Sequence, residues 1–268
     1  MKSKMTNTIK YPLYLLLITL LTACNIVDPG DEVSDTNFEA KESFSFEVDV
    51  TNHVRLRLEA VNGPVKITGL PGANSVKNWG ERRVGSESIE DAELHLQDLE
   101  VQVTEPAEEI FVKTKQPQDS RGRNYIVNYN ITLPENLEVL VDNVNGEVKI
   151  DSVKNQVSVS NVNGRINLND IFGSTVVNLV NGQIESEVTL PVDGTINMNT
   201  VNGNIDLDIP ENTSAEFSAN VTNGNISVSN LVLQNIVSSP NSLRGTLAAG
   251  QGTISLRTVN GNIWASGF

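Results

Sequence analysis

The chain has 268 residues, 38% of them hydrophobic and 5% aromatic, and a formal net charge of −14 at pH 7. So large an excess of acid repels nucleic acid and anionic lipid headgroups, which excludes a nucleic-acid-binding protein. A single cysteine excludes an internal disulfide, and with only two histidines no Cys/His metal site can be assembled.

Residues 1–23 have the pattern of an export signal. Lysines precede an apolar run from Leu13 to Leu21, and Ala23 and Cys24 follow it. A charged region, a short apolar region and a small residue before cysteine resemble the signal of bacterial lipoproteins, with cleavage between Ala23 and Cys24. The resemblance implies that the Cys24 thiol carries diacylglycerol and that lipid holds the mature chain to a membrane.

Two other interpretations of this segment are an uncleaved membrane helix and an ordinary secretory signal. The apolar run is about half of the ~20 residues that a bilayer span needs, so we predict no transmembrane helix in the mature chain. Removal of the signal takes away three lysines and lowers the formal charge to −17. Asn25 stands where inner-membrane retention signals commonly have Asp, which favours anchoring in the outer membrane of the bacterial envelope.

Residues 24–43 are expected to form a lipidated, flexible and acidic tether. The segment is poor in apolar residues and carries Pro29, Gly30 and several acids, a composition that favours solvated chain. The folded domain is therefore predicted over residues 44–268.

An Asn-Gly pair recurs seven times along this domain. Six of the seven pairs follow a valine directly. The steps between pairs are 18, 18, 21 and 21 residues from Asn145 to Asn223, and then 37 to Asn260, which indicates a further repeat near 241–250 that has lost its pair. The predicted corner residues are Asn62, Gly63, Asn145, Gly146, Asn163, Gly164, Asn181, Gly182, Asn202, Gly203, Asn223, Gly224, Asn260 and Gly261.

Between the pairs, apolar and polar residues alternate, as in the stretch from Ile205 to Ile209. This period of two predicts half-buried strands, two in each repeat. Two folds satisfy the pattern: an antiparallel meander with type I′ Asn-Gly turns, and a parallel β-solenoid with Asn-Gly at the same corner of every coil. We favour the all-β parallel solenoid, with about 18–21 residues per coil, because stacking explains why an amide that can form ladders recurs at one corner.

Residues 70–135 interrupt the repeat and are predicted to form a small inserted strand and helix segment. Ser88 and Asp91 form a capping box before apolar residues at helical spacing, which predicts a short helix. The predicted strands of the insertion are 99–104, 110–115 and 125–133. We expect the insertion to cover one end or flank of the solenoid and so protect an edge, and Trp264 and Phe268 to cover the other end.

Several of these motifs together resemble those of a known bacterial family. They are Val61-Asn62-Gly63-Pro64-Val65, the helix around Ala92-Glu93-Leu94, the strand from Tyr125 to Pro134, and the closing repeat from Gly250 to Ile263. Over about residues 45–268 the chain is similar to the bacterial putative-adhesin domain family of β-helix type. The resemblance implies a β-helix-like binding domain, and it brings no catalytic or ligand-binding residues with it.

Acidic residues on the outer face raise the alternative of an enzyme, since some right-handed β-helices cleave acidic polysaccharides. The residues considered are Glu147, Lys149, Asp151, Glu185, Glu187, Asp206 and Asp208. Charge at such positions is also what a solvated strand requires, so we assign no catalytic residue and no cofactor. Calcium stays open as a ligand of a stacked acidic face, although the glycine-aspartate nonapeptide of calcium-binding β-rolls does not occur in the sequence.

Trp79, Arg82 and Arg83 form the one cluster of aromatic and basic residues. An exposed tryptophan can stack on a sugar or contact a partner, and a buried one would pack under the insertion. We therefore predict a non-enzymatic, lipid-anchored envelope protein that binds an unknown glycan or envelope protein, or serves as a scaffold, through its repetitive surface. The alternatives are a polysaccharide-acting β-helix enzyme and an envelope sensor or regulator that acts through a partner.

Overall fold

The computed structural model describes residues 38–268. The predicted signal peptide and the lipidation site at Cys24 lie outside the described residues. Strand β1 (Phe38–Asp49) opens the fold, so residues 38–43, predicted as the end of a tether, are folded, and the predicted boundary is wrong. The reason is apolar alternation within β1, which packs side chains such as Phe44 against the hydrophobic core.

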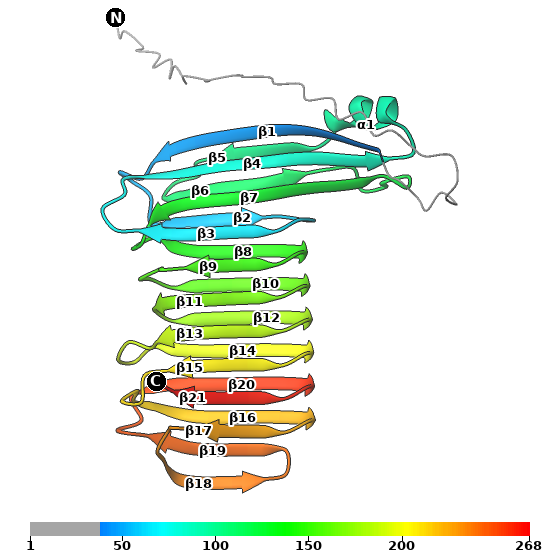
Figure 1. Cartoon of the computed structure of the whole chain (residues 1–268). Coiled ribbons are helices and arrows are strands. Elements are labelled where there is room, and N and C mark those ends of the chain that lie inside the picture. Colours follow the sequence, from blue (N-terminus) through cyan, green and yellow to red (C-terminus); the bar gives the residue numbers. More distant parts are fainter. Residues whose placement is uncertain (1–37) are drawn as a thin grey trace, which may run out of the picture. The chain divides into compact units, whose positions relative to one another are not determined.

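Two β-sheets enclose one hydrophobic core (Figure 1). Sheet A contains, in spatial order, β1, β4 (Ser75–Ser86), β7 (Asn124–Pro134), β3 (Val65–Leu70), β9 (Val148–Asp151), β11 (Ile166–Phe172), β13 (Ile184–Thr189), β15 (Ile205–Ile209), β21 (Ile263–Gly267) and β17 (Ile226–Ser229). Sheet B contains β18 (Leu233–Ser239), β19 (Ser242–Leu247), β16 (Ala215–Asn223), β20 (Gly252–Asn260), β14 (Thr195–Asn202), β12 (Thr175–Asn181), β10 (Val157–Asn163), β8 (Glu138–Asn145), β2 (Arg55–Glu59), β6 (Glu109–Lys115) and β5 (Glu100–Thr104).

Strands of successive repeats pair in parallel and keep a constant register. In sheet B, β10 lies between β8 and β12, so Val159 is aligned with Val141 on one side and Val177 on the other. In sheet A, β11 lies in the same way between β9 and β13. The chain therefore coils, one strand in each sheet per coil. The predicted parallel solenoid is confirmed, and the meander alternative is wrong for these repeats.

All seven Asn-Gly pairs lie in one column at one corner of the stack. Asn163 donates from Nδ2 to Asn145 Oδ1 at 2.7 Å and accepts a hydrogen bond from Asn181 Nδ2 at 2.8 Å. Each neighbouring pair of asparagines in the column is joined in this way, over 2.7–2.9 Å. The column runs Asn62, Asn145, Asn163, Asn181, Asn202, Asn260 and Asn223. The exposed amides thus hold the coils in register.

Glycine follows each asparagine because the coils approach too closely for a side chain. Gly182 has a φ of 144°, and a Cβ there would lie 1.9 Å from the carbonyl oxygen of Gly164 in the neighbouring coil. Both the backbone conformation and the contact therefore exclude other residues at this corner.

The inserted segment extends both sheets at one end of the stack. β6 and β7 pair in parallel with β2 and β3, and so form a further coil. β1 and β4 then continue sheet A in antiparallel pairing, and β5 continues sheet B in the same manner. The insertion supplies its predicted helix and strands, together with β4, which was not predicted because charged residues break its alternation.

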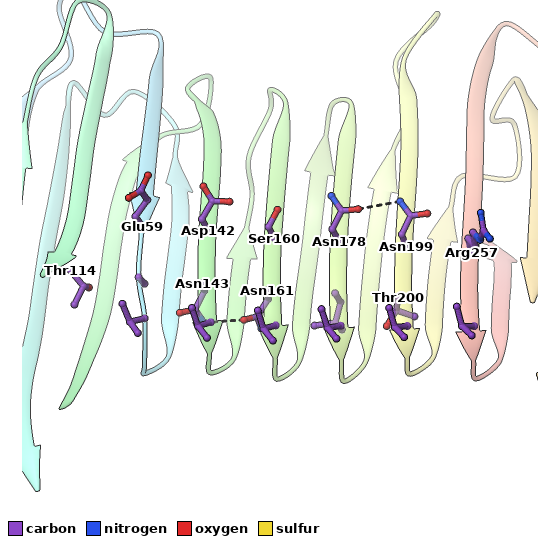
Figure 2. Close-up of a pocket in the computed structure, with 18 of the residues that line it drawn as sticks. Glu59, Thr114, Asp142, Asn143, Ser160, Asn161, Asn178, Asn199, Thr200 and Arg257 are labelled. Carbon is purple, nitrogen blue, oxygen red and sulfur yellow. Dashed lines mark hydrogen bonds between the residues drawn. The ribbon is translucent and has the colours of Figure 1, made fainter. Parts of the chain in front are cut away.

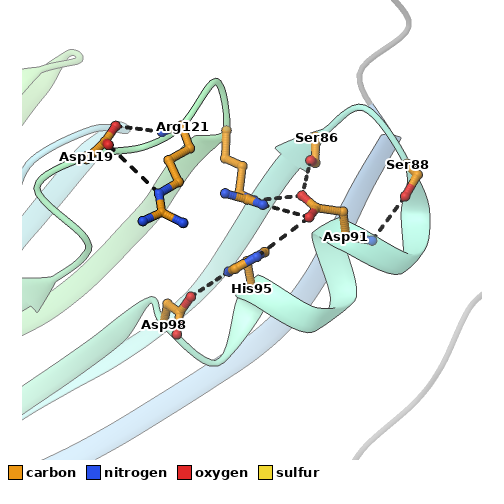
Figure 3. A network of polar contacts seen from close by, with 8 residues as sticks. Ser86, Ser88, Asp91, His95, Asp98, Asp119 and Arg121 are labelled. Atoms are coloured by element: carbon orange, nitrogen blue, oxygen red, sulfur yellow. Dashed lines mark hydrogen bonds and ion pairs between the residues drawn. The ribbon is translucent and has the colours of Figure 1, made fainter.

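Helix α1 (Ile89–Leu96) is held to the end of β4 and the start of β7 by a polar network (Figure 3). The Ser88 hydroxyl accepts from the Asp91 amide at 3.1 Å, as the predicted capping box requires. The Asp91 carboxylate accepts from Arg123 Nε and Nη2 at 2.6 and 2.7 Å, and from the Ser86 hydroxyl. These hydrogen bonds hold the pKa of Asp91 well below its usual range. Within the described chain no helix is long and apolar enough to cross a membrane.

The coil formed by β20 and β21 lies inside the stack. β20 pairs in parallel with β14 on one side and β16 on the other, and β21 lies between β15 and β17. The prediction that Trp264 and Phe268 cover the second end is therefore wrong. The predicted repeat near 241–250 is also wrong, since this region belongs to the antiparallel hairpin of β18 and β19, which ends sheet B beyond β16.

Candidate functional site

A groove of about 860 Å³ lies on the outer face of sheet B, beside the Asn-Gly corner (Figure 2). It crosses the C-terminal ends of β2, β8, β10, β12, β14 and β20, and residues of β6 line one end. Because these strands are stacked in register, equivalent residues of successive coils form rows along the groove.

One row consists of the valines that precede the Asn-Gly pairs. Its members are Val61, Val144, Val162, Val180, Val201 and Val259. The four central side chains, from Val144 to Val201, are 38–42% exposed, although valine is usually a core residue. Since neighbouring strands lie about 4.8 Å apart, six valines form an apolar stripe roughly 24 Å long.

A second row consists of outward side chains three positions before each asparagine of the corner. Its members are Glu59, Asp142, Ser160, Asn178, Asn199 and Arg257 (Figure 2). The three central members are uncharged, and Asn199 Nδ2 donates to Asn178 Oδ1 at 3.2 Å. At one end, Lys113 Nζ lies 2.8 Å from Glu59 and lowers the pKa of that carboxyl. The groove thus has an uncharged centre and charged ends.

Buried polar side chains lie beneath the groove, between the two rows. Asn143, Asn161 and Thr200 are only 3–5% exposed. Asn143 Nδ2 donates to Asn161 Oδ1 at 3.3 Å, and Asn161 Nδ2 donates to the Gly146 carbonyl at 2.9 Å. Asn143 Oδ1 and Thr200 Oγ1 have no hydrogen-bond partner among the described residues. An unpaired buried group of this kind costs about 1–3 kcal/mol.

The groove offers apolar and hydrogen-bonding groups along its length. Neither histidine nor cysteine is among the described residues that line it, and its carboxylates stand at one end, where Lys113 and Arg57 engage them. Valine methyls and amide or hydroxyl groups repeat coil by coil along its length. Such a surface suits a molecule that extends across several coils and has both apolar and hydrogen-bonding groups.

The predicted cluster at Trp79, Arg82 and Arg83 lies elsewhere, on β4 of sheet A. Trp79 is 56% exposed, so it does not pack under the insertion. Arg82 lies on the opposite face of the strand and forms an ion pair of 2.5 Å with Glu42. Arg83 lies 3.8 Å from Glu39. The structure therefore separates Arg82 from Trp79 and brings none of the three to the groove.

The acidic residues considered for an enzyme lie on the outer face of sheet A. Glu185 is aligned with Asp206, and Glu187 with Asp208. Burial raises the pKa of Asp206, and the negative charges of Asp208 and Glu185 raise it further. No group of three or more His, Cys, Asp or Glu within residues 38–268 is arranged to hold a metal ion. These carboxylates lie at the surface of the sheet that does not carry the groove, with Asp206 partly buried among them.

The valine row was not predicted as a surface feature, although the sequence contains its signal. Alternation from the inward residues Ile196, Met198 and Thr200 places Val201 on the outer face. The same reasoning applies to each valine before an Asn-Gly pair. The direction of these valines stayed open from the sequence alone, and the alternation of buried and exposed positions in each strand decides it.

Comparison with known proteins adds a family and a fold. The family model described as Toastrack DUF4097 matches residues 58–264. No significant match was found among curated proteins. A solved structure of a putative cell adhesion protein from Clostridium sporogenes ATCC 15579 is 14% identical, with a TM-score of 0.52, and the match covers 85% of this chain and 100% of that one. At this identity the likeness shows a shared fold.

Two further solved structures are more distant. Putative adhesins from Bacteroides fragilis NCTC 9343 and Parabacteroides distasonis ATCC 8503 are each 10% identical, with TM-scores of 0.27 and 0.24. The matches cover 85% and 84% of this chain, and 98% and 97% of theirs. Similarity at this level says nothing about the groove.

Proposed function

Because this chain belongs to the Toastrack DUF4097 family, we propose that it is a non-enzymatic binding protein of the bacterial cell envelope, active in adhesion or as a scaffold. The observation that carries the proposal is the groove, in which a valine row and an uncharged polar row repeat across the coils. Repeated weak contacts on a rigid surface favour an extended ligand, whether glycan or envelope protein, because each coil adds the same contribution. The name of the Clostridium sporogenes protein is compatible with this role.

The groove is tested by adding a charge to its apolar row. Val180→Lys changes a side chain that is 40% exposed, so we expect the fold to tolerate it and binding to intact cells, isolated envelopes or arrayed glycans to weaken at least tenfold. Val192→Lys is the matched control, since Val192 is 68% exposed at the corner between β13 and β14, outside the groove. Equal binding by both variants would contradict the proposal, as would turnover of an acidic glycan that Asp208→Asn abolishes.

We further propose that lipid on Cys24 anchors the domain in the outer membrane. The charged and apolar segment before Ala23-Cys24 and the asparagine at position 25 support this. A Cys24→Ala variant should lose lipid labelling and leave the membrane fraction, while its groove still binds. Proteolysis of intact cells then tells whether the domain faces outward or into the periplasm. Retention of Cys24→Ala in the membrane would contradict the anchor.

Binding is proposed to need no cofactor. Methyl, amide and hydroxyl groups, which supply the central contacts of the groove, require no metal to bind a neutral ligand. Binding should therefore survive chelation with EDTA. Loss of binding in EDTA, restored by calcium alone, would instead assign calcium to the ligand site.

A further inference from the structure

The two sheets end in four open edges, formed by β1, β17, β5 and β18. An open edge presents unpaired N–H and C=O groups, and proteins protect such edges with charges or by keeping them short. β1 carries Glu39, Lys41, Glu42, Glu47 and Asp49. β5 carries Glu100, and β17 is short, with Ile226 and Val228 packed against the core. Three of the four edges are therefore protected.

The fourth edge, β18, carries no charged residue and is not buried. From Phe217 to Leu243 the sequence contains no Asp, Glu, Lys, Arg or His, in a chain whose net charge is −14. Val232, Ile236 and Val237 are 78%, 58% and 68% exposed at this end of sheet B. An uncharged edge with exposed apolar side chains is the type of strand that pairs with another strand.

The hairpin of β18 and β19 is also not covered by sheet A. Sheet A ends at β17, whereas sheet B continues from β16 through β19 to β18 (Figure 1). Leu233 and Leu243 are consequently only partly buried. A bulge at Asn235, with a φ of 51°, interrupts the register with β19 between Gln234 and Val237. The bulge leaves the residues from Val237 to Ser239 as a regular and accessible edge.

We infer that β18 is the contact between two copies of this chain, which pair antiparallel about a two-fold axis beside Val237 and Ser238, so that the bulge at Asn235 lies at the end of the contact. Such an axis places the residues beside it next to their own symmetry mates, so a charge near the axis would face a like charge. Pairing of two β1 strands would bring like charges together, whereas β18 carries no charged residue. The neutral end is also where a second acidic molecule meets least repulsion, whereas a basic partner gains no attraction there.

A disulfide between copies tests the contact in the full chain. Cys24 is the only natural cysteine, so a cysteine introduced at Val237 reports on its own surroundings. Under mild oxidation of intact cells, Val237→Cys should give at least tenfold more disulfide-linked homodimer than Val192→Cys. The control is matched because both side chains are 68% exposed and both variants retain Cys24.

A charge variant tests the same contact without oxidation. In sedimentation of the detergent-solubilised full chain, the natural sequence and Val192→Lys should dimerise, and Val237→Lys should be monomeric with an unchanged circular dichroism spectrum. A monomeric natural chain at every concentration, or equal cross-linking by the two cysteine variants, would overturn the inference. Cross-linking of Val237→Cys to a different protein would also overturn it, because the edge would then serve another partner. Val180→Lys should still dimerise, which separates this test from that of the groove.

Discussion

Val201 illustrates how a hydrophobic residue in this repeat serves the surface. Its side chain is 42% exposed, whereas Thr200 beside it is 3% exposed and Ile205, past the corner, is fully buried. The polar residue is inside and the apolar residue outside, the reverse of the usual distribution. The valines therefore form the surface of the groove, whereas the buried residues after the corner stabilise the fold.

Substitutions at these two positions should separate the two roles. Val201→Asp should change the free energy of unfolding by no more than about 0.5 kcal/mol, as is usual for surface positions. Ile205→Ala should cost about 2–5 kcal/mol, because it removes a fully buried side chain. Urea unfolding followed by circular dichroism measures both. If Val201→Asp were as destabilising as Ile205→Ala, the valine row would belong to the core.

Among the elements, the asparagine column joins strands that are distant in sequence. Asn163, in the interior of the column, forms ladder bonds with Asn145 and Asn181, whereas Asn223 at its end forms one with Asn260. A net hydrogen bond contributes about 0.5–1.5 kcal/mol. Each amide contributes less than a core residue, but the column is continuous over seven coils.

Asn163→Ala should therefore destabilise the protein about twice as much as Asn223→Ala, by about 1–3 kcal/mol against about 0.5–1.5 kcal/mol. The two substitutions remove the same side chain from the same corner, so the difference reports the number of ladder bonds. Chemical denaturation of both variants provides the measurement. Equal losses would mean that the amides act individually with solvent and not as a ladder.

Acid should release helix α1 only at very low pH. Hydrogen bonds from Arg123 and Ser86 lower the pKa of Asp91 from its usual value of 3.8, so the unfolded chain takes up this proton before the folded one does. The stability that Asp91 provides is therefore complete above the unfolded pKa and declines as pH falls through the folded pKa. The free energy of unfolding should be compared between the natural chain and Asp91→Asn. The difference between the two should be constant above about pH 5 and should shrink below the pKa of Asp91 in the unfolded chain, near 3.8. A difference independent of pH would contradict the role of the carboxylate.

The sequence was sufficient to predict the elements of the repeats and the helix cap. Alternation such as that of Ile205 to Ile209 and the Asn-Gly corners defined each coil, and Ser88 with Asp91 defined the start of the helix. The start of β1 was missed because an edge strand carries charges at exposed positions, which resemble a solvated linker. β4, which is paired on both sides, was missed because its charged residues break the alternation. The groove was missed because it arises only when rows from several coils are placed side by side.

At the scale of the molecule, the predicted resemblance to the adhesin-type β-helix family is confirmed, but the order of the coils was not predictable. Asn202 bonds to Asn260 and not to Asn223, which is nearer in sequence. The repeats carry the same Val-Asn-Gly motif or a close variant, so local patterns fit either order. The difference lies in the hairpin of β18 and β19, whose antiparallel pairing with β16 closes that end.

Deletion of residues 252–268 should therefore do more than shorten the stack. It removes β20 and β21, through which β16 and β17 pair with the rest of the molecule. We expect the amides of β16 to β19 to lose protection in hydrogen exchange, while those of β8 to β12 keep theirs. Retained protection throughout β16 to β19 would show that this region is stable without the coil.

The insertion of β20 and β21 between earlier coils has a consequence for biosynthesis. The ribosome makes residues 215–247 before residues 252–267, although the later segment must lie between the earlier one and β14. During that interval the unfinished chain has two compatible surfaces, β14 and β16, with the same Asn-Gly corner on each. If β14 and β16 paired with each other first, β20 could not insert between them. The nascent chain therefore has to stay partly unfolded in this region, or be kept so by a chaperone, until β20 and β21 have been synthesised.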